Sequence, residues 1–324
     1  MKAVLIQNPG DASQMYLGDV PTPKPKAHEL LIEVKATAVN RADIGQREGS
    51  YPPPKGASPL MGLEAAGVVI QTGAGCRRFK EGDKVFGLLE GGGYAEYAAL
   101  DEGMAMPLPD HFSFEDGAAI PEVFLTAYQA LFWIGNLQQG ERVLIHAGGS
   151  GVGTAAIQMA KQVGAKIAIT AGSTEKLKAC LELGADMAVN YKEGPFIEKI
   201  GERSVNVVLD FIGAPYWEQN IRVLAADGRY VLISTLGGTI SDHLDLRPLL
   251  MKRLSITGTT LRARSLDYKK RLTQDFADWA LPHFIDGRIK PIVDRIFPFE
   301  NVQDAHRYME ANRNFGKIVL KVKE

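Results

Sequence analysis

A segment in the middle of the chain has the composition of a phosphate-binding turn. Residues 144–153 read LIHAGGSGVG, where Gly148 and Gly153 stand at the ends of a G-x-G-x-x-G pattern and Ser150 takes its middle position. Such a turn needs residues without a Cβ, because backbone N–H groups can then approach a pyrophosphate. The helix that follows directs its positive end at the same phosphates. We therefore predict a dinucleotide site, in which the Ser150 hydroxyl either bonds a phosphate or holds the backbone slightly away. The alternative is a tight turn that binds nothing.

The end of the next strand-like run indicates which dinucleotide is bound. An NAD-binding fold carries Asp or Glu about 20 residues after the turn, where the acid bonds the ribose hydroxyls. Here residues 171–176 read AGSTEK, so that Gly172 and Ser173 stand where the acid is expected. Gly172 leaves room for a 2′-phosphate, Ser173 can bond it, and Lys176 supplies a cation one helical turn later. We predict NADPH. The opposing interpretation makes Lys176 a solvated helix charge, which Glu175 would screen.

The histidines and cysteines do not form a pattern that would bind zinc. The chain has two cysteines, Cys76 and Cys180, and none of its six histidines lies in a ligand-spaced cluster with either of them. The histidines are His28, His111, His146, His243, His283 and His306. We expect chemistry without a metal ion. Two cysteines also cannot build a disulfide framework, and free thiols suit a reducing compartment, so we expect a cytoplasmic protein.

The composition is that of an ordinary globular protein. Hydrophobic residues make up 45% and charged residues 23% of 324 residues, which is enough material for two domains with a core each. The formal net charge is −1 and no block of lysine or arginine occurs, so we expect neither nucleic acid nor an anionic membrane as a partner. No stretch approaches the roughly 20 apolar residues of a membrane span.

The elements that must position these residues fall into two patterns. Residues 30–34, 66–71 and 84–88 read as strands in a mostly β block with proline- and glycine-rich turns. From about residue 122, apolar strands alternate with helices, which predicts a parallel sheet covered on both faces in a doubly wound nucleotide fold. The strands are predicted at residues 143–147, 166–170, 187–190, 205–212, 229–234 and 254–257, and the helices at 124–134, 152–163, 174–183 and 216–224. The tail, with a helix at 265–281 and a last strand at 317–322, is expected to return to the β block.

Short motifs outside the glycine-rich turn are distributed over nearly the whole chain. They are AVNRAD (38–43), YPPP (51–54), GLEAAG (62–67), GGGYAEY (91–97), AAIP (118–121), LTAY (125–128), NYK (190–192) and NFGKIV (314–319). As a set they resemble the zinc-free quinone oxidoreductases, the zeta-crystallin-like branch of the medium-chain dehydrogenase/reductase superfamily. The stress-inducible animal members of that branch are especially similar. In zinc-dependent relatives, a cysteine ligand stands where this chain has Asn40 and a histidine ligand where it has Leu63.

The resemblance implies an α/β chain with a GroES-like β domain, residues 1–121 and 263–324, and a Rossmann domain, residues 122–262. It places the active site in a cleft between the two domains and implies a homodimer formed through the edge of the Rossmann sheet. Many bacterial relatives carry a tyrosine where this chain has Gly45, so we expect a wider substrate pocket or a different acceptor.

The resemblance also implies the cofactor contacts. Asn40 lies near the nicotinamide ribose and Thr126 near the nicotinamide end. The remaining contacts are Ser150, Gly151 and Val152 on the pyrophosphate, Ser173, Lys176 and Tyr191 on the 2′-phosphate, Ile212, Leu236 and Gly237 along the adenine and nicotinamide sides, and Leu261, Arg262, Asn314 and Lys317 on the far side.

The chemistry expected is hydride transfer from nicotinamide C4 to a quinone. Holding the two rings together can suffice for a good acceptor, and a nearby donor would stabilise the negative charge that grows on the carbonyl oxygen. Asn40 and Tyr51 are the candidate donors, and Tyr51 or water would deliver the proton. Arg41 and Asp43 are interpreted as a structural pair that orients the loop.

Two other functions compete with the quinone reductase. The first is an NADPH-dependent enoyl or alkenal reductase, which would turn over α,β-unsaturated ketones faster than quinones. The second is an NADPH-binding protein with negligible turnover, acting as a sensor or a structural protein.

Overall fold

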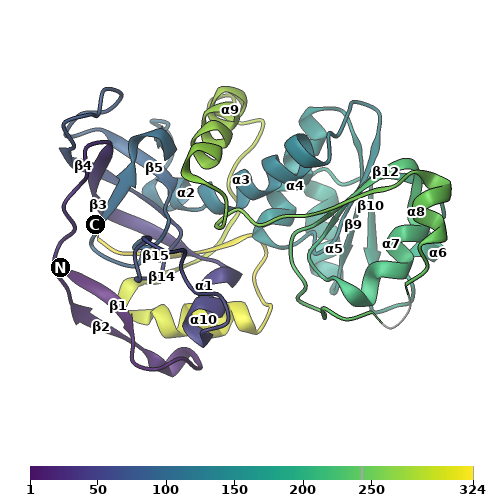
Figure 1. Ribbon diagram of the computed structural model, residues 1–324, viewed down its shortest axis with the longest axis horizontal. Helices are drawn as coiled ribbons and strands as arrows, with labels where there is room; N and C mark the ends of the chain where they lie inside the picture. The colour runs from purple at the N-terminus through teal and green to yellow at the C-terminus, as the bar shows by residue number, and fades with distance from the viewer. Residues whose placement is uncertain (242–243, 324) are drawn as a thin grey trace. The chain divides into compact units, whose positions relative to one another are not determined.

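A computed structural model describes residues 1–241 and 244–323, so that His243 lies outside the described residues. The chain divides into two compact units (Figure 1). Unit 1 consists of Met1–Leu125 and Arg262–Glu324, and unit 2 of Thr126–Leu261. The domain boundaries from the sequence, after residues 121 and 262, stay a prediction. Among the described residues, no helix is both long and apolar enough to cross a membrane.

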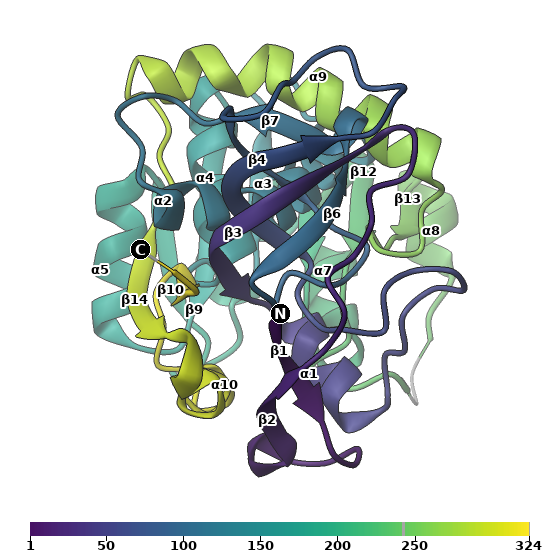
Figure 2. The same ribbon diagram turned by 90° about the vertical axis from the view of Figure 1, so that its left-hand side faces the viewer.

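Unit 1 is built on a seven-stranded sheet in the order β14-β15-β3-β4-β5-β7, with β6 also paired to β3 (Figure 2). The C-terminal β15 lies antiparallel to β3, with Val319 opposite Ala38, so the tail joins the N-terminal sheet as expected. The strands of this sheet are β3 (Glu29–Val39), β4 (Glu64–Thr72), β5 (Lys84–Leu88), β6 (Tyr97–Asp101), β7 (Ala105–Pro107), β14 (Val293–Pro298) and β15 (Lys317–Lys321). Strands β1 (Lys2–Ile6) and β2 (Met15–Asp19) form a separate two-stranded antiparallel sheet. The helices of this unit include α1 (Arg41–Glu48), α2 (Phe114–Ala118), α9 (Leu266–Ile285) and α10 (Val302–Glu310).

Helix α1 starts directly where β3 ends, and the sequence analysis missed it. Its N-cap is Asn40, and a capping box joins Asn40 to Asp43. The capping box starts the helix at this point and so ends the strand before it. The predicted pairing of Arg41 with Asp43 is wrong. Asp43 is buried and accepts a hydrogen bond from the backbone N–H of Asn40, whereas Arg41 donates to the carbonyl of Met309 on α10.

Unit 2 is a six-stranded parallel sheet in the order β10-β9-β8-β11-β12-β13. The strands are β8 (Arg142–Ile145), β9 (Lys166–Ala171), β10 (Met187–Asn190), β11 (Val205–Asp210), β12 (Leu224–Leu232) and β13 (Ser255–Gly258). The helices are α4 (Gly151–Gln162), α5 (Thr174–Leu183), α6 (Ile197–Ile200), α7 (Trp217–Val223) and α8 (Arg247–Lys252). The chain moves outward in both directions from β8, so the strand order reverses between β8 and β11. In open α/β sheets, ligands bind at such a switch point, outside the carboxyl ends of the strands. The doubly wound fold is thus confirmed.

The helix expected at residues 124–134 has a different form. Helix α3 (Pro121–Tyr128) begins on a proline, a residue that suits the first helical position. It continues as π-helix over Gln129–Ile134. Apolar periodicity does not distinguish these two helical forms, because both present buried residues at similar spacing.

Candidate active site

The glycine-rich turn connects the carboxyl end of β8 to the start of α4. An ideal Cβ on Gly153 would lie 2.5 Å from the carbonyl oxygen of Ala147, and one on Gly148 would lie 2.9 Å from Cβ of Ile169. Both ends of the pattern therefore must be glycine for the helix to pack so closely on the turn. Ser150 fits the middle position because it is the N-cap of α4, where its hydroxyl oxygen accepts a hydrogen bond from the N–H of Gly153 at 3.0 Å.

The end of β9 brings together three residues predicted to bind the 2′-phosphate region. Tyr191 follows β10, which runs parallel to β9, and its hydroxyl oxygen lies 2.5 Å from where a Cβ on Gly172 would be. Ser173 is the N-cap of α5 and accepts a hydrogen bond from the N–H of Lys176 at 3.3 Å. Hydrogen bonds from its own backbone N–H and from the Ser173 hydroxyl lower the pKa of the Glu175 carboxyl at this helix start. Whether Glu175 screens Lys176 stays a prediction.

Asp210, at the end of β11, positions a turn that the sequence analysis assigned to the cofactor. Its buried carboxylate accepts hydrogen bonds from the backbone N–H groups of Ile212 at 2.7 Å and Gly213 at 3.1 Å, and from the Tyr230 hydroxyl at 2.5 Å. The N–H of Gly237 donates to the carbonyl of Ile212 at 2.9 Å, so these two predicted residues lie together. Asp210 was not identified from the sequence, where its only sign is an acid at the end of an apolar strand.

His146 is buried and structural, as expected for the end of β8. Its ring nitrogens lie 2.9 Å from the Thr170 hydroxyl and 2.7 Å from the Asn220 amide oxygen. Burial lowers the pKa of the imidazole, so the neutral form is favoured. The other predicted residues of unit 2 differ in exposure: Thr126 and Leu261 are buried, Gly151 and Val152 are partly buried, and Leu236 is 59% exposed.

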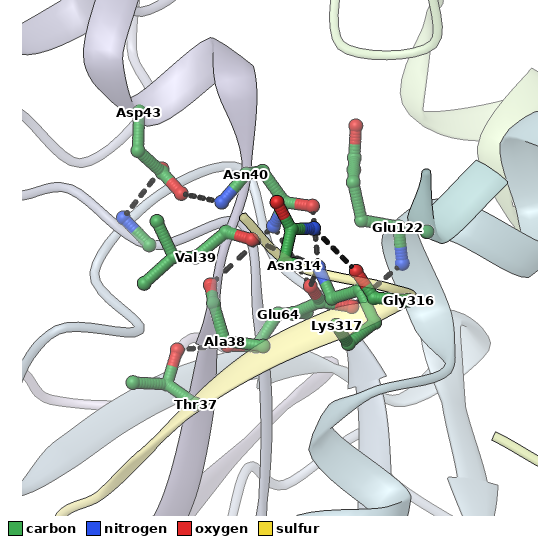
Figure 3. Close-up of polar contacts among 12 residues, drawn as sticks. Thr37, Ala38, Val39, Asn40, Asp43, Glu64, Glu122, Asn314, Gly316 and Lys317 are labelled. Atoms are coloured by element: carbon green, nitrogen blue, oxygen red, sulfur yellow. Dashed lines mark hydrogen bonds and ion pairs between the residues drawn. The ribbon is translucent and has the colours of Figure 1, made fainter. Parts of the chain in front are cut away.

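The predicted residues of unit 1 centre on a buried ion pair (Figure 3). The Lys317 ammonium lies 2.8 Å from Oε1 of Glu64 and donates to Oδ1 of Asn40 at 2.6 Å and to the carbonyl of Val39 at 3.1 Å. The side chains of Lys317 and Glu64 are 3% and 0% exposed. The Lys317 ammonium is therefore held in place by three oxygen acceptors. Nearby, Asn314 donates to the carbonyl of Gly316 at 2.7 Å.

The amide of Asn40 is largely occupied by this cluster. Its Nδ2 donates to Oε1 of Glu64 at 2.7 Å and, weakly, to the carbonyl of Ala38 at 3.4 Å. The second, long contact is the one that a ligand oxygen could replace at little cost. On the backbone side, Asp43 binds the N–H of Asn40 at 2.8 Å and the Tyr94 hydroxyl at 3.2 Å. Burial raises the pKa of Asp43 to about 6.

Tyr51 lies partly buried beside Arg262. The Arg262 guanidinium is 5.5 Å from the centre of the Tyr51 ring, donates to the Tyr51 carbonyl at 3.3 Å and donates to Oε1 of Gln46 at 2.7 Å. Burial raises the pKa of the Tyr51 phenol, and the negative charge of Glu122 raises it further. Gly45 permits this packing, because an ideal Cβ there would lie 3.0 Å from Cβ of Tyr51. Tyr51 is therefore kept as a hydrogen-bond donor at neutral pH.

Glu122, at the start of α3, was not identified from the sequence. Its backbone N–H donates to Oε2 of Glu64 at 2.8 Å, while its side chain is directed away from Lys317 (Figure 3). Burial raises the pKa of the Glu122 carboxyl to about 8, and the nearby charge of Glu64 adds to that shift. The sequence sign was an acid that follows Pro121 in the first helical turn. Among the described residues, no group of three or more His, Cys, Asp or Glu side chains is arranged to hold a metal ion.

Two family models match the chain. Residues 26–110 match the alcohol dehydrogenase GroES-like domain, and residues 151–278 match the zinc-binding dehydrogenase model. The quinone oxidoreductase of Rattus norvegicus is 32% identical over 99% of this chain and 97% of its own length. That of Homo sapiens is 33% identical over 99% of this chain and 97% of its own length.

Solved structures of similar proteins cover the chain from end to end. The Escherichia coli quinone oxidoreductase complexed with NADPH has a TM-score of 0.88 and 28% identity, covering 99% of this chain and 100% of its own. An NAD-dependent alcohol dehydrogenase has a TM-score of 0.87 and 33% identity with the same coverage of both chains. The CurK enoyl reductase has a TM-score of 0.85 and 27% identity, covering 99% of this chain and 98% of its own.

Each partner of the buried ion pair should stabilise unit 1 only while the other is present. We expect Lys317→Met to destabilise unit 1 by about 3–5 kcal/mol, because it leaves the Glu64 carboxylate unpaired in the interior. Glu64→Gln should have a similar effect, and the double variant should lose much less than the sum of the two. Chemical denaturation measures all three. The control is Lys323→Met, which removes an exposed ion pair with Glu33 near the same chain end and should cost less than about 1 kcal/mol. Additive losses in the double variant would contradict the coupling.

The glycine-rich turn should not tolerate a methyl group at its last position. We expect Gly153→Ala to lose about 1–3 kcal/mol of stability or of NADPH binding energy, since the new Cβ meets backbone oxygens that cannot rotate away. Thermal denaturation and a fluorescence titration with NADPH measure the two quantities. In the control, Gly10→Ala, the new Cβ meets only the flexible side chain of Gln14 at 3.1 Å. Unchanged stability and affinity in Gly153→Ala would show that the turn is looser than the contacts indicate.

Proposed function

The chain belongs to the quinone oxidoreductases of the medium-chain dehydrogenase/reductase superfamily, and from that membership we propose that it is an NADPH-dependent quinone reductase that works without a metal ion. The observation that carries the proposal is the likeness to proteins named quinone oxidoreductase over 99% of the chain. A structural neighbour that is complexed with NADPH supports the choice of cofactor.

The residues present fit a dinucleotide phosphate. Gly148 and Gly153 form a cradle that a Cβ would fill, and the first-turn N–H groups of Gly151 and Val152 belong to a helix start that favours anions. Ser173 and Lys176 would hold the 2′-phosphate beside the Tyr191 hydroxyl, which lies so close to Gly172 that a Cβ there would meet it at 2.5 Å. The negative charge of Glu175 would repel that phosphate, so NADPH has to be compared with NADH, which lacks it. In unit 1, we assign Asn40, Arg262, Asn314 and Lys317 to the cofactor.

When bound, the reduced nicotinamide supplies a hydride. The residues of the chain would orient the acceptor and stabilise the charge on its oxygen. The Tyr51 hydroxyl, kept protonated by burial, donates to that oxygen, and the second hydrogen of the Asn40 amide replaces its long contact to Ala38 with a shorter one. Lys317 holds Asn40 in place through Oδ1. Because the Lys317 ammonium lies among the acceptors of this cluster, a divalent cation has no favourable place there.

The leading experiment is an acceptor panel. We expect the protein to oxidise NADPH with ortho- or para-quinones faster than with enones, at rates that EDTA does not change. Faster turnover of α,β-unsaturated ketones would favour a double-bond reductase, the function that the likeness to the CurK enoyl reductase supports. Tight NADPH binding without turnover of any acceptor would leave only a sensor or structural role.

The 2′-phosphate assignment has its own test. Lys176→Ala should raise the Michaelis constant for NADPH about tenfold and leave that for NADH nearly unchanged, because a charge-assisted hydrogen bond to the phosphate is lost. Initial rates with both cofactors measure this. Lys178→Ala is the matched control, since Lys178 lies on the same helix and pairs with Glu182. If the Michaelis constants for both cofactors rise together, Lys176 does not bind the 2′-phosphate.

We also propose a homodimer formed along β13, the edge strand of the parallel sheet. Apolar side chains before this strand are exposed: Ile240 is 82%, Leu250 78% and Met251 64% exposed. An uncovered strand edge next to such a surface favours association with a second copy. A cytoplasmic location stays a prediction from the free thiols Cys76 and Cys180.

Leu250→Asp should convert the dimer to a monomer, because it places a charge in the apolar surface that the second copy would cover. Analytical ultracentrifugation measures the mass. The control Leu181→Asp introduces the same charge on α5, where the leucine is 45% exposed and far along the sheet order from β13. A monomeric wild type, or a dimer that survives Leu250→Asp, would contradict the proposed interface.

A further inference from the structure

Glu122 is a carboxyl group that the proposed chemistry has not yet used. Only its backbone N–H takes part in the Lys317 cluster, through Oε2 of Glu64. Among the described residues, no side chain donates a hydrogen bond to the Glu122 carboxyl. The side chain is directed away from Lys317 (Figure 3) and out of the ion-pair cluster. Its charge acts on the Tyr51 phenol, which places the carboxyl near the candidate donor.

Arg262, whose guanidinium lies 5.5 Å from the centre of the Tyr51 ring, supplies a second, independent sign of a ligand beside Tyr51. Arg262 is 5% exposed, and its two terminal nitrogens donate to Oε1 of Gln46 and to the Tyr51 carbonyl. The Nε–H of Arg262 is buried and has no hydrogen-bond partner among the described residues. An unpartnered buried donor costs about 1–3 kcal/mol. An acceptor oxygen bound beside Tyr51 would satisfy it.

We propose that Glu122 is the proton donor of the reaction, and that it protonates the acceptor oxygen to which Tyr51 and Asn40 donate, beside the unpartnered Nε–H of Arg262. This inference rests on the proposed reduction of a quinone. The two electrons reach the acceptor with the hydride. In the proton step, the O–H bond of the Glu122 carboxyl breaks, an O–H bond forms on the reduced acceptor, and no electrons are transferred. Water then returns a proton to the carboxylate.

The surroundings of Glu122 suit both halves of that step. Burial and the charges of Glu64 and Asp43 disfavour its carboxylate, while the charges of Lys317 and Arg262 favour it. The balance raises the pKa to about 8, so the acid carries its proton at neutral pH. After the transfer, Arg262 offsets the new negative charge. Tyr51, whose pKa lies above its ordinary value, holds the oxygen and keeps its own proton.

The test compares Glu122→Gln with the wild type across pH. The acidic form is the active one, so wild-type turnover should fall as pH rises through about 8. The glutamine variant should lose that alkaline decrease and be slower by about 100-fold or more with electron-rich quinones, whose reduced forms are weak acids. With strongly electron-poor quinones, whose reduced forms need no proton, its rate should stay near that of the wild type.

Two variants separate this role from a structural one. Glu115→Gln removes a carboxylate from the first turn of α2, as Glu122→Gln does from α3, and should keep both the rate and the alkaline decrease. Tyr51→Phe should be slower but keep the decrease. An infrared titration of the protein without cofactor adds a readout that does not need turnover: a protonated-carboxyl band should disappear around pH 8 in the wild type and be missing in Glu122→Gln.

The outcomes distinguish the two proposals. If the wild type reduces quinones and Glu122→Gln keeps the alkaline decrease, or loses rate equally with all quinones, Glu122 is not the donor and the proposed function stands. If the infrared band is absent in the wild type near pH 7, the carboxyl is ionised and the donor role is wrong. If the wild type reduces no quinone, the donor role and the proposed function both fail.

Discussion

The ion pair between Lys317 and Glu64 is the interaction on which the architecture of unit 1 depends. Lys317 opens the last strand, Glu64 opens β4, and Asn40 follows the end of β3. The pair therefore joins the C-terminal strand to the N-terminal part of the sheet at the point where α1 begins. Two charges in the interior are tolerated only with good geometry and further hydrogen bonds. Here, the Val39 carbonyl and the Glu122 N–H supply such bonds. The cluster therefore fixes the position of Asn40 more firmly than a loop alone would.

Unit 2 depends on a steric constraint of a different kind. The α4 helix starts so close to β8 and β9 that Gly148 and Gly153 have no room for a Cβ. Ser150 can replace the middle glycine because that position is an N-cap. There the hydroxyl oxygen accepts a hydrogen bond from the N–H of Gly153, which has no partner within the helix. The departure from the glycine pattern is therefore compatible with the same turn, and it leaves the helix start available for an anion.

The sequence predicted the parts of the fold that depend on local pattern. Alternating apolar strands and helices identified the sheet of unit 2, and Lys166–Ala171 and Thr174–Leu183 lie almost where the pattern placed them. Helix α1 was missed because its polar residues carry little apolar periodicity, although Asn40 and Asp43 form its capping box. Asp210 and Glu122 were missed for another reason. Asp210 bonds Tyr230 as well as the nearby N–H groups of Ile212 and Gly213, and the surroundings of Glu122 come from distant segments. An acid at the end of a strand or in a first helical turn is too common a local pattern to identify either residue.

The two glutamates of unit 1 show how the same side chain is given two different tasks. Glu64 has the Lys317 ammonium, the Asn40 amide and a backbone N–H within hydrogen-bond distance, all of which stabilise a carboxylate. Glu122 gives its N–H to Glu64 but receives no side-chain donor among the described residues, and burial therefore favours its neutral form. Neighbouring acids whose environments differ in this way commonly divide structural and proton-transfer work. Within the ion pair that anchors Asn40, the Glu64 charge raises the pKa of Glu122 and the Lys317 charge lowers it, so that burial decides the balance.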